Sequence, residues 1–346
     1  MSTTVLGIET SCDETGVAIV RDGELLADVT ATSMDEYARY GGIIPEIASR
    51  AHLEQMVPTI NAALAKAGVT LSDISAVAVT AGPGLIGSLT VGVSAAKALA
   101  YGLNVPLYAV NHIIGHIAVD QLHDGAFPDK FIGLIVSGGH SNILLVNNIA
   151  TDVTELGGTL DDAAGEAFDK VGRLLGLPYP GGPHIDRLSQ QGDKNAIRFP
   201  RGLEGGKNKE RHKYDFSFSG LKTAVARYIE GVESRGEEVN VPDVAAGFTE
   251  AIVDTLTKKA LNACAIHGCD TLVVGGGFSA NSRLRALAKE RGEVAGVDVR
   301  IPPLRYCTDN GAMVAMLGYN LIENGVSPSA LDITVDPNMP LDQTHM

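Results

Sequence analysis

The sequence has no tryptophan, only four cysteines and a shortage of positive charge. Lysine and arginine number 27 against 41 aspartates and glutamates, so the formal net charge is −14 at pH 7. This excess of negative charge argues against a nucleic-acid surface over the whole chain, although it does not exclude a local one. The cysteines, Cys12, Cys264, Cys269 and Cys307, form no C-x-x-C pair. We therefore expect free thiols in a reducing compartment rather than a disulfide framework.

Segments that would direct the chain to a membrane are also missing. Residues 1–11 contain neither a basic stretch nor a long apolar core, so no signal peptide is expected. No ionisable side chain occurs between Ile74 and Lys97, a length sufficient to span a membrane. This window contains Gly82, Pro83 and Gly84, however, and is better explained by a buried strand, a turn and a packed helix. The sequence thus predicts a soluble, cytoplasmic protein.

Two common phosphate-binding motifs are absent from their usual places. No G-x-G-x-x-G fingerprint opens a leading βαβ unit, and no G-x-x-x-x-G-K-[ST] loop occurs, so Rossmann and P-loop proteins lose support. What the chain does have is 346 residues, 45% hydrophobic content and 40 glycines. These values suit an α/β protein of about two domains with many tight strand–helix turns.

The most informative short segment is Asn-His-Ile-Ile-Gly-His at residues 111–116. It follows an apolar, strand-like run at 105–110, and Asn111 is a good N-cap for a helix. A helix that begins there places His112 and His116 on the same face. Two imidazoles at this spacing can bind one divalent metal, although unrelated core or surface histidines can have the same spacing.

Three turns rich in glycine or hydroxyl residues follow expected strands, at 10–15, 137–141 and 275–281. The strand–turn–strand pattern at 5–20 recurs at 131–146, which indicates an internal duplication. Ligands bind at the carboxyl ends of strands in open α/β sheets, and small residues let backbone N–H groups approach an anion closely. The pattern therefore favours a nucleotide bound between two similar lobes.

Helical periodicity, capping residues and loop residues predict most of the remaining elements. Helices are expected at 45–67, 161–175, 241–267, 279–291 and 308–322, the last opened by Thr308 or Asp309. Loops are expected at 177–183 and 198–213.

Several segments together resemble one known family. They occur at residues 7–15 (Gly-Ile-Glu-Thr-Ser-Cys-Asp-Glu-Thr), 111–116, 136–140 (Val-Ser-Gly-Gly-His), 164–170 (Ala-Gly-Glu-Ala-Phe-Asp-Lys), 179–183 (Tyr-Pro-Gly-Gly-Pro), 215–222 (Asp-Phe-Ser-Phe-Ser-Gly-Leu-Lys), 275–281 and 307–313 (Cys-Thr-Asp-Asn-Gly-Ala-Met). In this order, and over nearly the whole chain, they resemble the TsaD family. Its members are tRNA N6-adenosine threonylcarbamoyltransferases, also known by the older name O-sialoglycoprotein endopeptidase.

The resemblance implies a fold and a reaction. The fold is the two-lobed α/β fold of actin, Hsp70 and sugar kinases (ASKHA), with duplicated sheet-plus-helix halves and a central cleft. We expect residues 1–130 and about 310–346 in the N-terminal lobe, and residues 131–309 in the C-terminal lobe. The reaction moves the threonylcarbamoyl group of threonylcarbamoyl-AMP to N6 of the adenosine beside the anticodon, position 37, in tRNAs that read codons beginning with A. AMP is released.

The resemblance also implies site residues, a cofactor and partners. The metal ligands are His112, His116 and Asp309, and the metal is most often Fe(II), with Zn(II) as the second candidate. The adenylate is bound by Ile135, Val136, Ser137, Gly138, Gly139, Asp169, Gly182, Asp186 and Asn281. The bacterial helper proteins are an inactive-looking paralogue (TsaB), an ATPase (TsaE) and the enzyme that makes the adenylate (TsaC).

The chemistry of the residues agrees with these roles. Two histidines and a carboxylate with open coordination positions suit Fe(II) or Zn(II). Backbone N–H groups at 137–139 can bind anionic oxygens, and the predicted aspartates and asparagine can bind hydroxyls. The adenine amine is a weak nucleophile and needs activation, for which the positions of Asp13 and Glu14 make them candidates.

One departure and two rival functions remain. Archaeal and eukaryotic relatives have a tyrosine metal ligand where this chain has Ile135, which leaves the fourth ligand open. A zincin-type metalloendopeptidase would need a glutamate after the first histidine, and Ile113 stands there. A sugar-kinase-like phosphotransferase of the same fold would not use the histidine pair.

One dense basic stretch stands out in this acidic chain. Between residues 198 and 213 the charged side chains are mostly positive, and the segment leads directly into the family motif at 215–222. Its basic residues are Arg198, Arg201, Lys207, Lys209, Arg211 and Lys213. A charge run is usually a solvated face, but this one is a candidate contact for tRNA phosphates.

Overall fold

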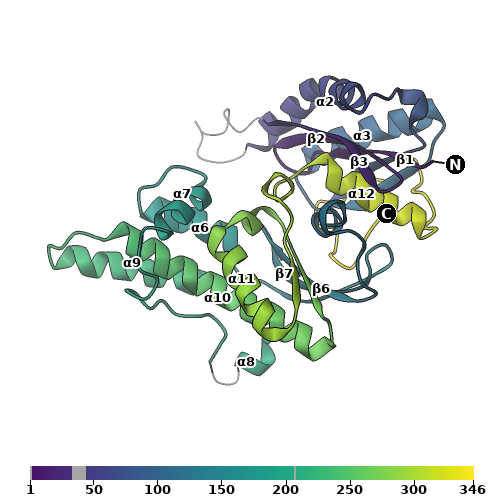
Figure 1. The fold of residues 1–346 in the computed structure, drawn as a ribbon. Coiled ribbons are helices and arrows are strands. Elements are labelled where there is room, and N and C mark those ends of the chain that lie inside the picture. The colour runs from purple at the N-terminus through teal and green to yellow at the C-terminus, as the bar shows by residue number, and fades with distance from the viewer. Residues whose placement is uncertain (1, 33–43, 206–207) are drawn as a thin grey trace. The chain divides into compact units, whose positions relative to one another are not determined.

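The computed structural model describes residues 2–32, 44–205 and 208–346. The chain is an α/β protein with two compact units, each built on a five-stranded sheet (Figure 1). Unit 1 comprises Met1–Asp129, Val146–Thr154 and Pro302–Met346. Unit 2 comprises Lys130–Leu145 and Glu155–Ile301.

The sheet of unit 1 has the strand order β3-β2-β1-β4-β5. β1 pairs antiparallel with β2 and parallel with β4, β2 pairs antiparallel with β3, and β4 pairs parallel with β5. The strands are β1 (Thr4–Glu9), β2 (Glu14–Arg21), β3 (Glu24–Thr32), β4 (Ala76–Gly82) and β5 (Leu107–Asn111). The helices are α2 (Pro45–Ala67), η1 (Leu71–Asp73), α3 (Ile86–Leu103), α4 (His112–Ala118), α5 (Gln121–Asp124), η3 (Leu304–Tyr306) and α12 (Gly311–Glu323).

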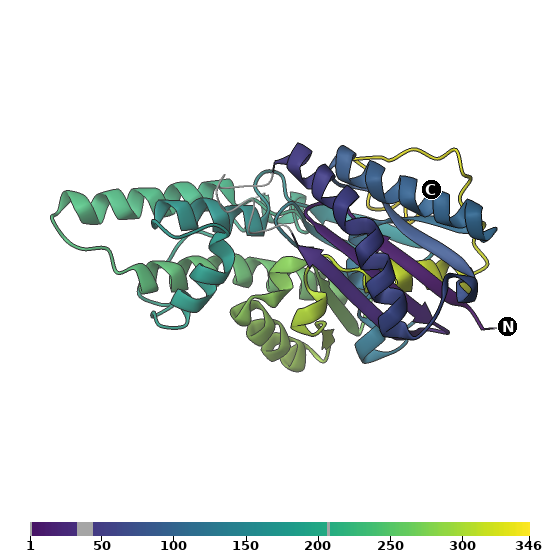
Figure 2. The same ribbon diagram turned by 90° about the horizontal axis from the view of Figure 1, so that it is seen from above.

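Alternation along β1 explains how helices cover both faces of this sheet. Leu6 and Ile8 belong to a core cluster with residues of α2 and α3, which lie together over one face (Figures 1 and 2). Gly7, between them, faces α12: a Cβ there would lie 2.4 Å from the backbone nitrogen of Ala315. Successive side chains of a strand point to opposite faces, so the missing side chain lets α12 approach the backbone of the sheet closely.

The first turn of α12 is fixed in the same way. A Cβ at Gly311 would lie 2.4 Å from the backbone nitrogen of Ala18 in β2, too close for any real contact. We therefore expect Gly311→Ala to lower the free energy of unfolding by about 1–3 kcal/mol, because the helix or the strand must shift. Gly102→Ala in α3 is the matched control, since a Cβ there meets nothing within 4 Å. Alanine is the better helix former, so chemical denaturation should show a neutral or stabilising effect of up to about 1 kcal/mol for Gly102→Ala.

Unit 2 repeats the plan of unit 1. Its sheet has the order β10-β9-β6-β7-β8, and the parallel β6–β9 and β9–β10 pairs match β1–β4 and β4–β5. This correspondence confirms the predicted duplication. The strands of this sheet are β6 (Phe131–Val136), β7 (Ser141–Asn148), β8 (Asp152–Gly158), β9 (Thr271–Gly275) and β10 (Asp298–Arg300). Val146–Thr154, which includes the end of β7 and the start of β8, is counted with unit 1. The helices are α6 (Ala164–Leu174), α7 (Gly181–Ser189), α8 (Asn208–Arg211), α9 (Ser219–Ser234), α10 (Val241–His267), η2 (Gly277–Ala280) and α11 (Ser282–Ala295).

The core of unit 2 forms around α10. Its buried side chains include Phe248, whose ring centroid lies 4.8 Å from that of Phe168 in α6. Phe168 also contacts Phe278, with ring centroids 4.7 Å apart. Burial of such large rings supplies much of the hydrophobic stabilisation. This packing fixes α6 and η2 beside β6, near the turns at 137–141 and 275–281 that are predicted to bind a nucleotide.

Four predicted elements were wrong in their boundaries or type. The last helix begins at Gly311 with Asn310 as its N-cap, not at Thr308 or Asp309. The helix predicted at 279–291 begins at Ser282, because Asn281 caps it. The loop predicted through residue 183 ends where α7 begins at Gly181. The segment at 198–213, predicted as a loop, contains the short helix α8. Lys207, which belongs to this segment but not to α8, lies outside the described residues.

Among the described residues, α3 is the one helix long and apolar enough to cross a membrane. It packs against β4 and α2 within unit 1. Length and composition alone are weak grounds for a membrane span, because core helices meet the same criteria. The strand, turn and helix predicted for this window are confirmed by β4 and α3.

Candidate functional site

Two histidines of unit 1 are positioned by the start of α4. The side chain of Asn111 accepts hydrogen bonds from the N–H groups of Ile113 (2.9 Å) and Ile114 (3.3 Å), as expected of an N-cap. Its amide nitrogen donates to the carbonyls of Pro340 and Gln343, both at 2.9 Å, which ties the cap to the C-terminal segment. The helix therefore begins at His112, and the prediction that His112 and His116 share a face is confirmed by the 4.8 Å between their ring centroids.

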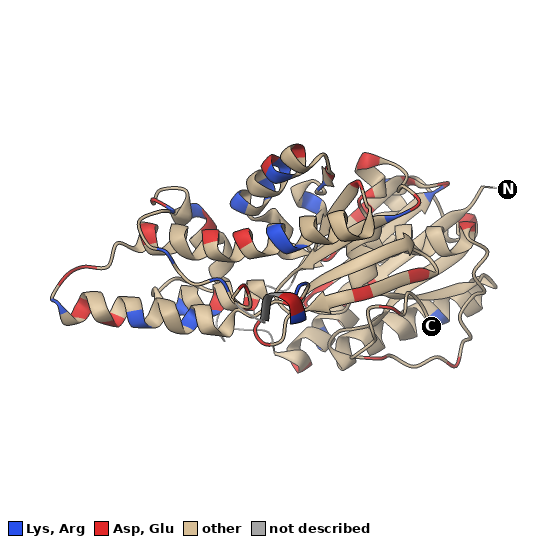
Figure 3. Cartoon of the chain, turned by 90° about the horizontal axis from the view of Figure 1, so that it is seen from below, with Lys and Arg blue, Asp and Glu red and all other residues tan. Residues whose placement is uncertain are grey.

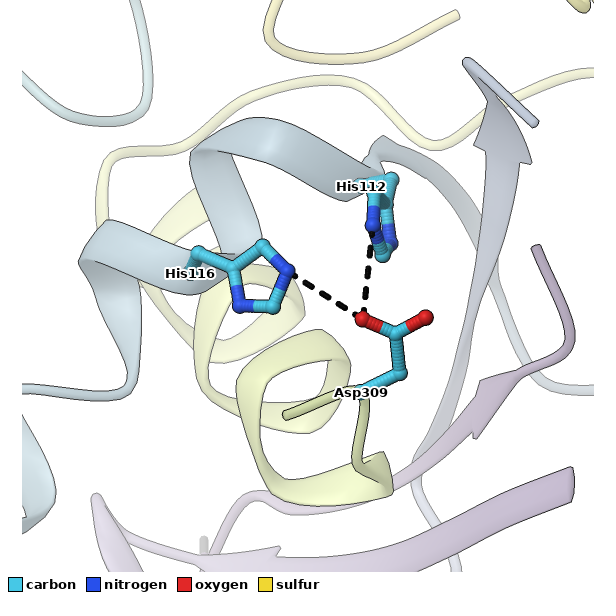
Figure 4. Close-up of side chains that lie close together, drawn as sticks. All are labelled: His112, His116 and Asp309. Atoms are coloured by element: carbon cyan, nitrogen blue, oxygen red, sulfur yellow. Dashed lines mark ion pairs between the residues drawn. The ribbon is translucent and has the colours of Figure 1, made fainter. Parts of the chain in front are cut away.

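A carboxylate from a distant segment completes the cluster. Asp309 lies directly before the Asn310 cap of α12, so its side chain is outside the helix and points at the histidines (Figure 4). One oxygen, Oδ1, lies 3.3 Å from Nε2 of His116 and 3.6 Å from Nε2 of His112. His116 is almost fully buried, whereas Asp309 keeps some exposure, so the cluster is open on one side.

These distances fit a metal site. Ligand atoms about 2.1 Å from one ion are about 3.0–3.4 Å apart, close to the 3.3 and 3.6 Å that separate Oδ1 of Asp309 from the two histidine nitrogens. A charge-assisted hydrogen bond to imidazolium would be shorter, about 2.7–2.9 Å. One ligand atom from each of the three side chains lies within 4.8 Å of the others. Two imidazoles and a carboxylate are a donor set that Fe(II) and Zn(II) accept, so the three residues form a possible metal site.

His112 has further partners on its other nitrogen. Nδ1 lies 3.2 Å from Oε2 of Glu9 and 3.1 Å from Oγ of Ser11. Glu9 is fully buried at the end of β1. It was not among the predicted site residues, although an acidic residue at the end of an apolar strand is a signal that could have identified it.

The surrounding carboxylates create a strongly negative site. Burial by itself would lower the pKa of His112, but Asp309 and Glu9 outweigh it and raise that pKa to about 9. Burial, with Asp309 and Asp13 beside it, raises the pKa of Glu14 to about 9. The pKa of Asp13 is also raised, chiefly by burial. A divalent cation held among these groups would favour their ionised forms.

The turn that contains Asp13 and leads into Glu14, the first residue of β2, is held by α2 and α3. His52 of α2 is buried, with Nδ1 2.8 Å from the hydroxyl of Thr15 and Nε2 3.1 Å from the carbonyl of Cys12. The hydroxyl of Ser88 in α3 donates to the same carbonyl at 3.3 Å. The structure therefore brings the predicted catalytic carboxylates close to Asp309, one of the three predicted metal ligands.

In unit 2, the turn after β6 is closed by its own hydrogen bonds. The N–H of Ser137 donates to the carbonyl of His140 at 2.8 Å, and the Ser137 hydroxyl accepts from the N–H of His140 at 3.1 Å. The Ser137 N–H is thus engaged within the turn in this structure. Ile135 and Val136 are fully buried, so their side chains present no surface to a ligand.

The glycines near this turn face open space. A Cβ built at Gly138, Gly139 or Gly182 would meet no atom within 4 Å. By contrast, a Cβ at Gly165 of α6 would lie 2.7 Å from the carbonyl oxygen of Ser137. The turn is therefore packed on one side and open on the other, as a cradle for a ligand would be.

Three predicted polar residues hold helix N-termini around this turn. Asp169 Oδ1 accepts the N–H of Gly181 at 2.8 Å at the start of α7. Asp186 accepts the N–H (3.2 Å) and hydroxyl (2.8 Å) of Ser282 at the start of α11. Asn281 caps α11 by accepting the N–H of Leu284 at 2.9 Å. These bonds link α6, α7 and α11 at the carboxyl ends of β6 and β9.

The run at 82–87 has the letters G-x-G-x-x-G after β4, but its glycines pack inside unit 1. A Cβ at Gly82 would collide with the carbonyl oxygen of Asp336, and one at Gly84 would lie 2.6 Å from that of Ser11. This run provides close packing and no cradle for phosphate.

Comparisons with known proteins agree on one family. The model of the TsaD family, described as tRNA N6-adenosine threonylcarbamoyltransferase, matches residues 24–316. A protein of Bifidobacterium longum with the same description is 58% identical over 342 residues, which cover 99% of each chain.

Two solved structures are similar in fold. HypF of T. kodakarensis matches with a TM-score of 0.65 at 15% identity, over 94% of this chain and 48% of HypF. Component A of (R)-2-hydroxyglutaryl-CoA dehydratase from Acidaminococcus fermentans matches with a TM-score of 0.53 at 14% identity, over 92% and 99% of the two chains. At such identities the likeness concerns the fold alone, and it confirms the ASKHA-like class.

Proposed function

This chain belongs to the TsaD family of tRNA N6-adenosine threonylcarbamoyltransferases, and from this premise we propose how its residues carry out the reaction. The protein is a transferase that modifies N6 of an adenosine in tRNA. The donor we propose is threonylcarbamoyl-AMP, and the acceptor is the adenosine at position 37 in tRNAs that read codons beginning with A. The observation that carries the proposal is the convergence of His112, His116 and Asp309 beside two further carboxylates.

We assign the metal to His112, His116 and Asp309, with Fe(II) favoured over Zn(II). A divalent cation bound there would act as a Lewis acid, which could polarise the carbamoyl carbonyl or neutralise the negative charge of the phosphate. The chain contributes the directions of its ligands: the Asn111 cap fixes α4, and the Asn310 cap leaves Asp309 outside α12. Ligands fixed before binding do not have to be ordered when the substrate arrives.

We assign the adenylate to unit 2. The N–H groups of Gly138 and Gly139 would bind its anionic oxygens, since the space beside both residues is open. Asp169 and Asp186 would accept hydrogen bonds from ribose or threonine hydroxyls, and the Asn281 amide could accept from or donate to them, through the capacity that remains beyond their helix caps. Gly182, at the start of α7, leaves room for the ligand. We further propose that units 1 and 2 correspond to the N-terminal and C-terminal lobes.

We assign proton removal to the carboxylates of the first loop. N6 of adenosine attacks the carbamoyl carbon, the bond from that carbon to the phosphate oxygen breaks, and AMP leaves with the electron pair. The proton lost from N6 passes to Glu14, or to Asp13 beside it, in the ionised form. Both carboxylates are buried near Asp309, and a cation held there would favour the ionised form that accepts this proton.

The rival functions are not favoured. Ile113 is buried next to His112, so no glutamate stands where a zincin-type peptidase needs its general base. The decisive assay incubates the protein and its helpers with threonylcarbamoyl-AMP and tRNA, with casein and with ATP plus a sugar as parallel substrates. The proposal is supported if threonylcarbamoyl is incorporated into tRNA while casein and the sugar remain unchanged. Casein cleavage or sugar phosphorylation without tRNA modification would refute it.

We propose that the enzyme works in the cytoplasm with three bacterial helper proteins. TsaC would supply the adenylate, and TsaB and TsaE would assemble with this chain. Mixing experiments with the four purified proteins test this proposal. Transfer to tRNA should require TsaC as the source of the adenylate, and its rate should rise when TsaB and TsaE are added.

We propose that the basic segment contacts tRNA. Figure 3 shows Lys and Arg interspersed with Asp and Glu along the helices of the chain, so a sign-biased run is unusual here. Arg201 is bound to Asp254 at 3.0 Å and is therefore engaged within the fold. Lys213 lies over the Tyr214 ring, 4.8 Å from its centroid, which leaves its charge near the surface of the segment.

Replacement of four residues of this segment together by serine is expected to weaken tRNA binding by the assembled complex. These residues are Lys207, Lys209, Arg211 and Lys213. For every phosphate that is no longer bound, the slope of log affinity against log salt should fall by about 0.7–0.9, while adenylate affinity stays the same. Filter binding at several salt concentrations measures both the affinity for tRNA and this slope.

A control variant removes four positive charges elsewhere by serine substitution. These are Arg50, Lys66, Lys194 and Lys289, all exposed. The control should keep most of the affinity for tRNA and of the salt slope. It loses the same number of positive charges, but at positions that we do not expect to contact tRNA. Equal effects in the two variants would mean that the basic segment is only a solvated face.

A further inference from the structure

Glu9 is a buried carboxylate that touches a proposed metal ligand from behind. It is fully buried, and its side chain makes three hydrogen bonds that can be assigned atom by atom. Oε1 accepts the backbone N–H of Ser11 at 2.5 Å. Oε2 accepts the hydroxyl of Thr80 at 2.5 Å and faces Nδ1 of His112 at 3.2 Å.

These bonds determine which nitrogen of His112 carries its proton. A carboxylate can only accept hydrogen bonds, so Nδ1 of His112 must be the donor to Oε2. In the neutral imidazole, which is the form that binds a metal, a proton on Nδ1 leaves the lone pair on Nε2, the nitrogen that faces Asp309 at 3.6 Å. A neutral imidazole needs that lone pair to bind a metal.

We propose that Glu9 is a positioning residue that keeps His112 in the Nδ1–H tautomer, with Nε2 presented to the metal. The inference rests on the proposed metal role of His112. Ser11 Oγ, 3.1 Å from the same Nδ1, can act as a second acceptor and support the orientation of the ring. Glu9 has no exposed surface, so it does not touch the substrate and acts only through His112.

The contacts of Glu9 make Glu9→Gln a sharp test. The N–H of Ser11 cannot become an acceptor, so the amide oxygen must take the place of Oε1, 2.5 Å from that nitrogen. The amide NH2 then takes the place of Oε2 and faces Thr80 and His112. The Thr80 hydroxyl can rotate to accept, but Nδ1 of His112 can accept only if its proton moves to Nε2. Glutamine should therefore block the metal-binding nitrogen while preserving size and shape.

The experiment loads metal-free protein with Zn(II) or Co(II) and measures affinity by competition with a chromophoric chelator. We expect Glu9→Gln to weaken binding by about 10- to 100-fold, as is typical when the partner of a metal-bound histidine is removed. Protein with ¹⁵N-labelled histidine and saturating Zn(II) reports the proton position directly, with the His112 signals assigned by their disappearance in His112→Gln. The wild type should show His112 bound through Nε2 with Nδ1–H. The variant should show His112 unbound with Nε2–H, and the visible spectrum of the Co(II) form should change.

Two further variants separate this effect from loss of charge or of folding. Thr80→Val removes the other donor to Oε2 and should leave the tautomer unchanged and the metal affinity within about threefold. Glu9→Asp keeps the charge but withdraws the carboxylate, so it should also lower affinity, and it carries the test if Glu9→Gln does not fold. The proposal fails if Glu9→Gln keeps His112 bound through Nε2, whether its affinity is normal or merely lower. If the wild-type protein binds neither metal through His112, the proposed metal role fails instead.

Discussion

Replacement of His112 or Asp309 by alanine should remove the bound divalent metal and, with it, nearly all threonylcarbamoyl transfer. Each substitution leaves two of three protein ligands, and a Lewis acid contributes several kcal/mol to a charged transition state. With about 1.4 kcal/mol per decade, the expected loss of kcat/KM is on the order of 10³-fold. Elemental analysis of anaerobically purified protein, together with the transfer assay, measures both effects on the same sample.

The fold should survive these substitutions, because both ligands extend from helix ends that are capped independently of them. Asn111 caps α4 and Asn310 caps α12, so circular dichroism and the unfolding midpoint should change little. His123→Ala is the matched control, since His123 is half exposed and pairs only loosely with Asp124 at 3.9 Å. A metal-free His112→Ala protein with full transfer activity would overturn the assignment of the metal site.

Local sequence signals were sufficient for one half of the proposed metal site. Asn111 is both the last residue of β5 and the N-cap of α4, and an N-cap followed by apolar residues is a pattern that the sequence displays. Once the helix begins at His112, the relation of the two histidines follows from helix geometry. The long α10 could be predicted for a similar reason: it begins after the Asn240 cap and ends before Gly268 in the left-handed conformation.

The other half of the site required the tertiary structure. Thr308, Asp309 and Asn310 are consecutive residues that can each cap a helix, and propensity ranks the three closely. Packing decides among them: Gly311 must lie against the backbone of Ala18, so the first turn of α12 begins there and Asn310 becomes the cap. This shift of two or three residues leaves Asp309 outside the helix, where its side chain faces the histidines. A helix that began at Thr308 or Asp309 would have placed that carboxylate within its first turn.

The role of Glu9 was hidden for a related reason. Its partners Thr80 and His112 are 71 and 103 residues away in the sequence, and a strand alternation pattern does not reveal such neighbours. The helix caps formed by Asp169 and Asp186 were missed for the same reason. The residue types indicated hydrogen bonding, but only the packing of α6, α7 and α11 determines the partner.

Substitution of Gly138 by valine should weaken adenylate binding by about 10- to 100-fold while the protein stays folded. A Cβ at Gly138 meets no protein atom within 4 Å, so the valine can be accommodated in the free protein. Its methyl groups would then occupy the space through which an anionic oxygen reaches the N–H groups of Gly138 and Gly139. Hydrogen bonds to charged groups contribute about 1.5–3 kcal/mol each, so the loss of one accounts for the expected factor. Calorimetry with a non-hydrolysable adenylate analogue measures the affinity.

Two comparison variants make this result specific to the turn. Gly231→Val lies on α9, where a Cβ meets only the end of the Arg235 side chain at 3.8 Å, and it should leave adenylate affinity unchanged. Gly165→Val places its Cβ 2.7 Å from the Ser137 carbonyl oxygen, so it should lower both affinity and stability by forcing the turn away from α6. Gly138→Val is expected to differ from both, with normal unfolding and weak binding. If its adenylate affinity equals that of Gly231→Val, the open side of the turn does not bind the adenylate, and the anion must be bound elsewhere in the chain.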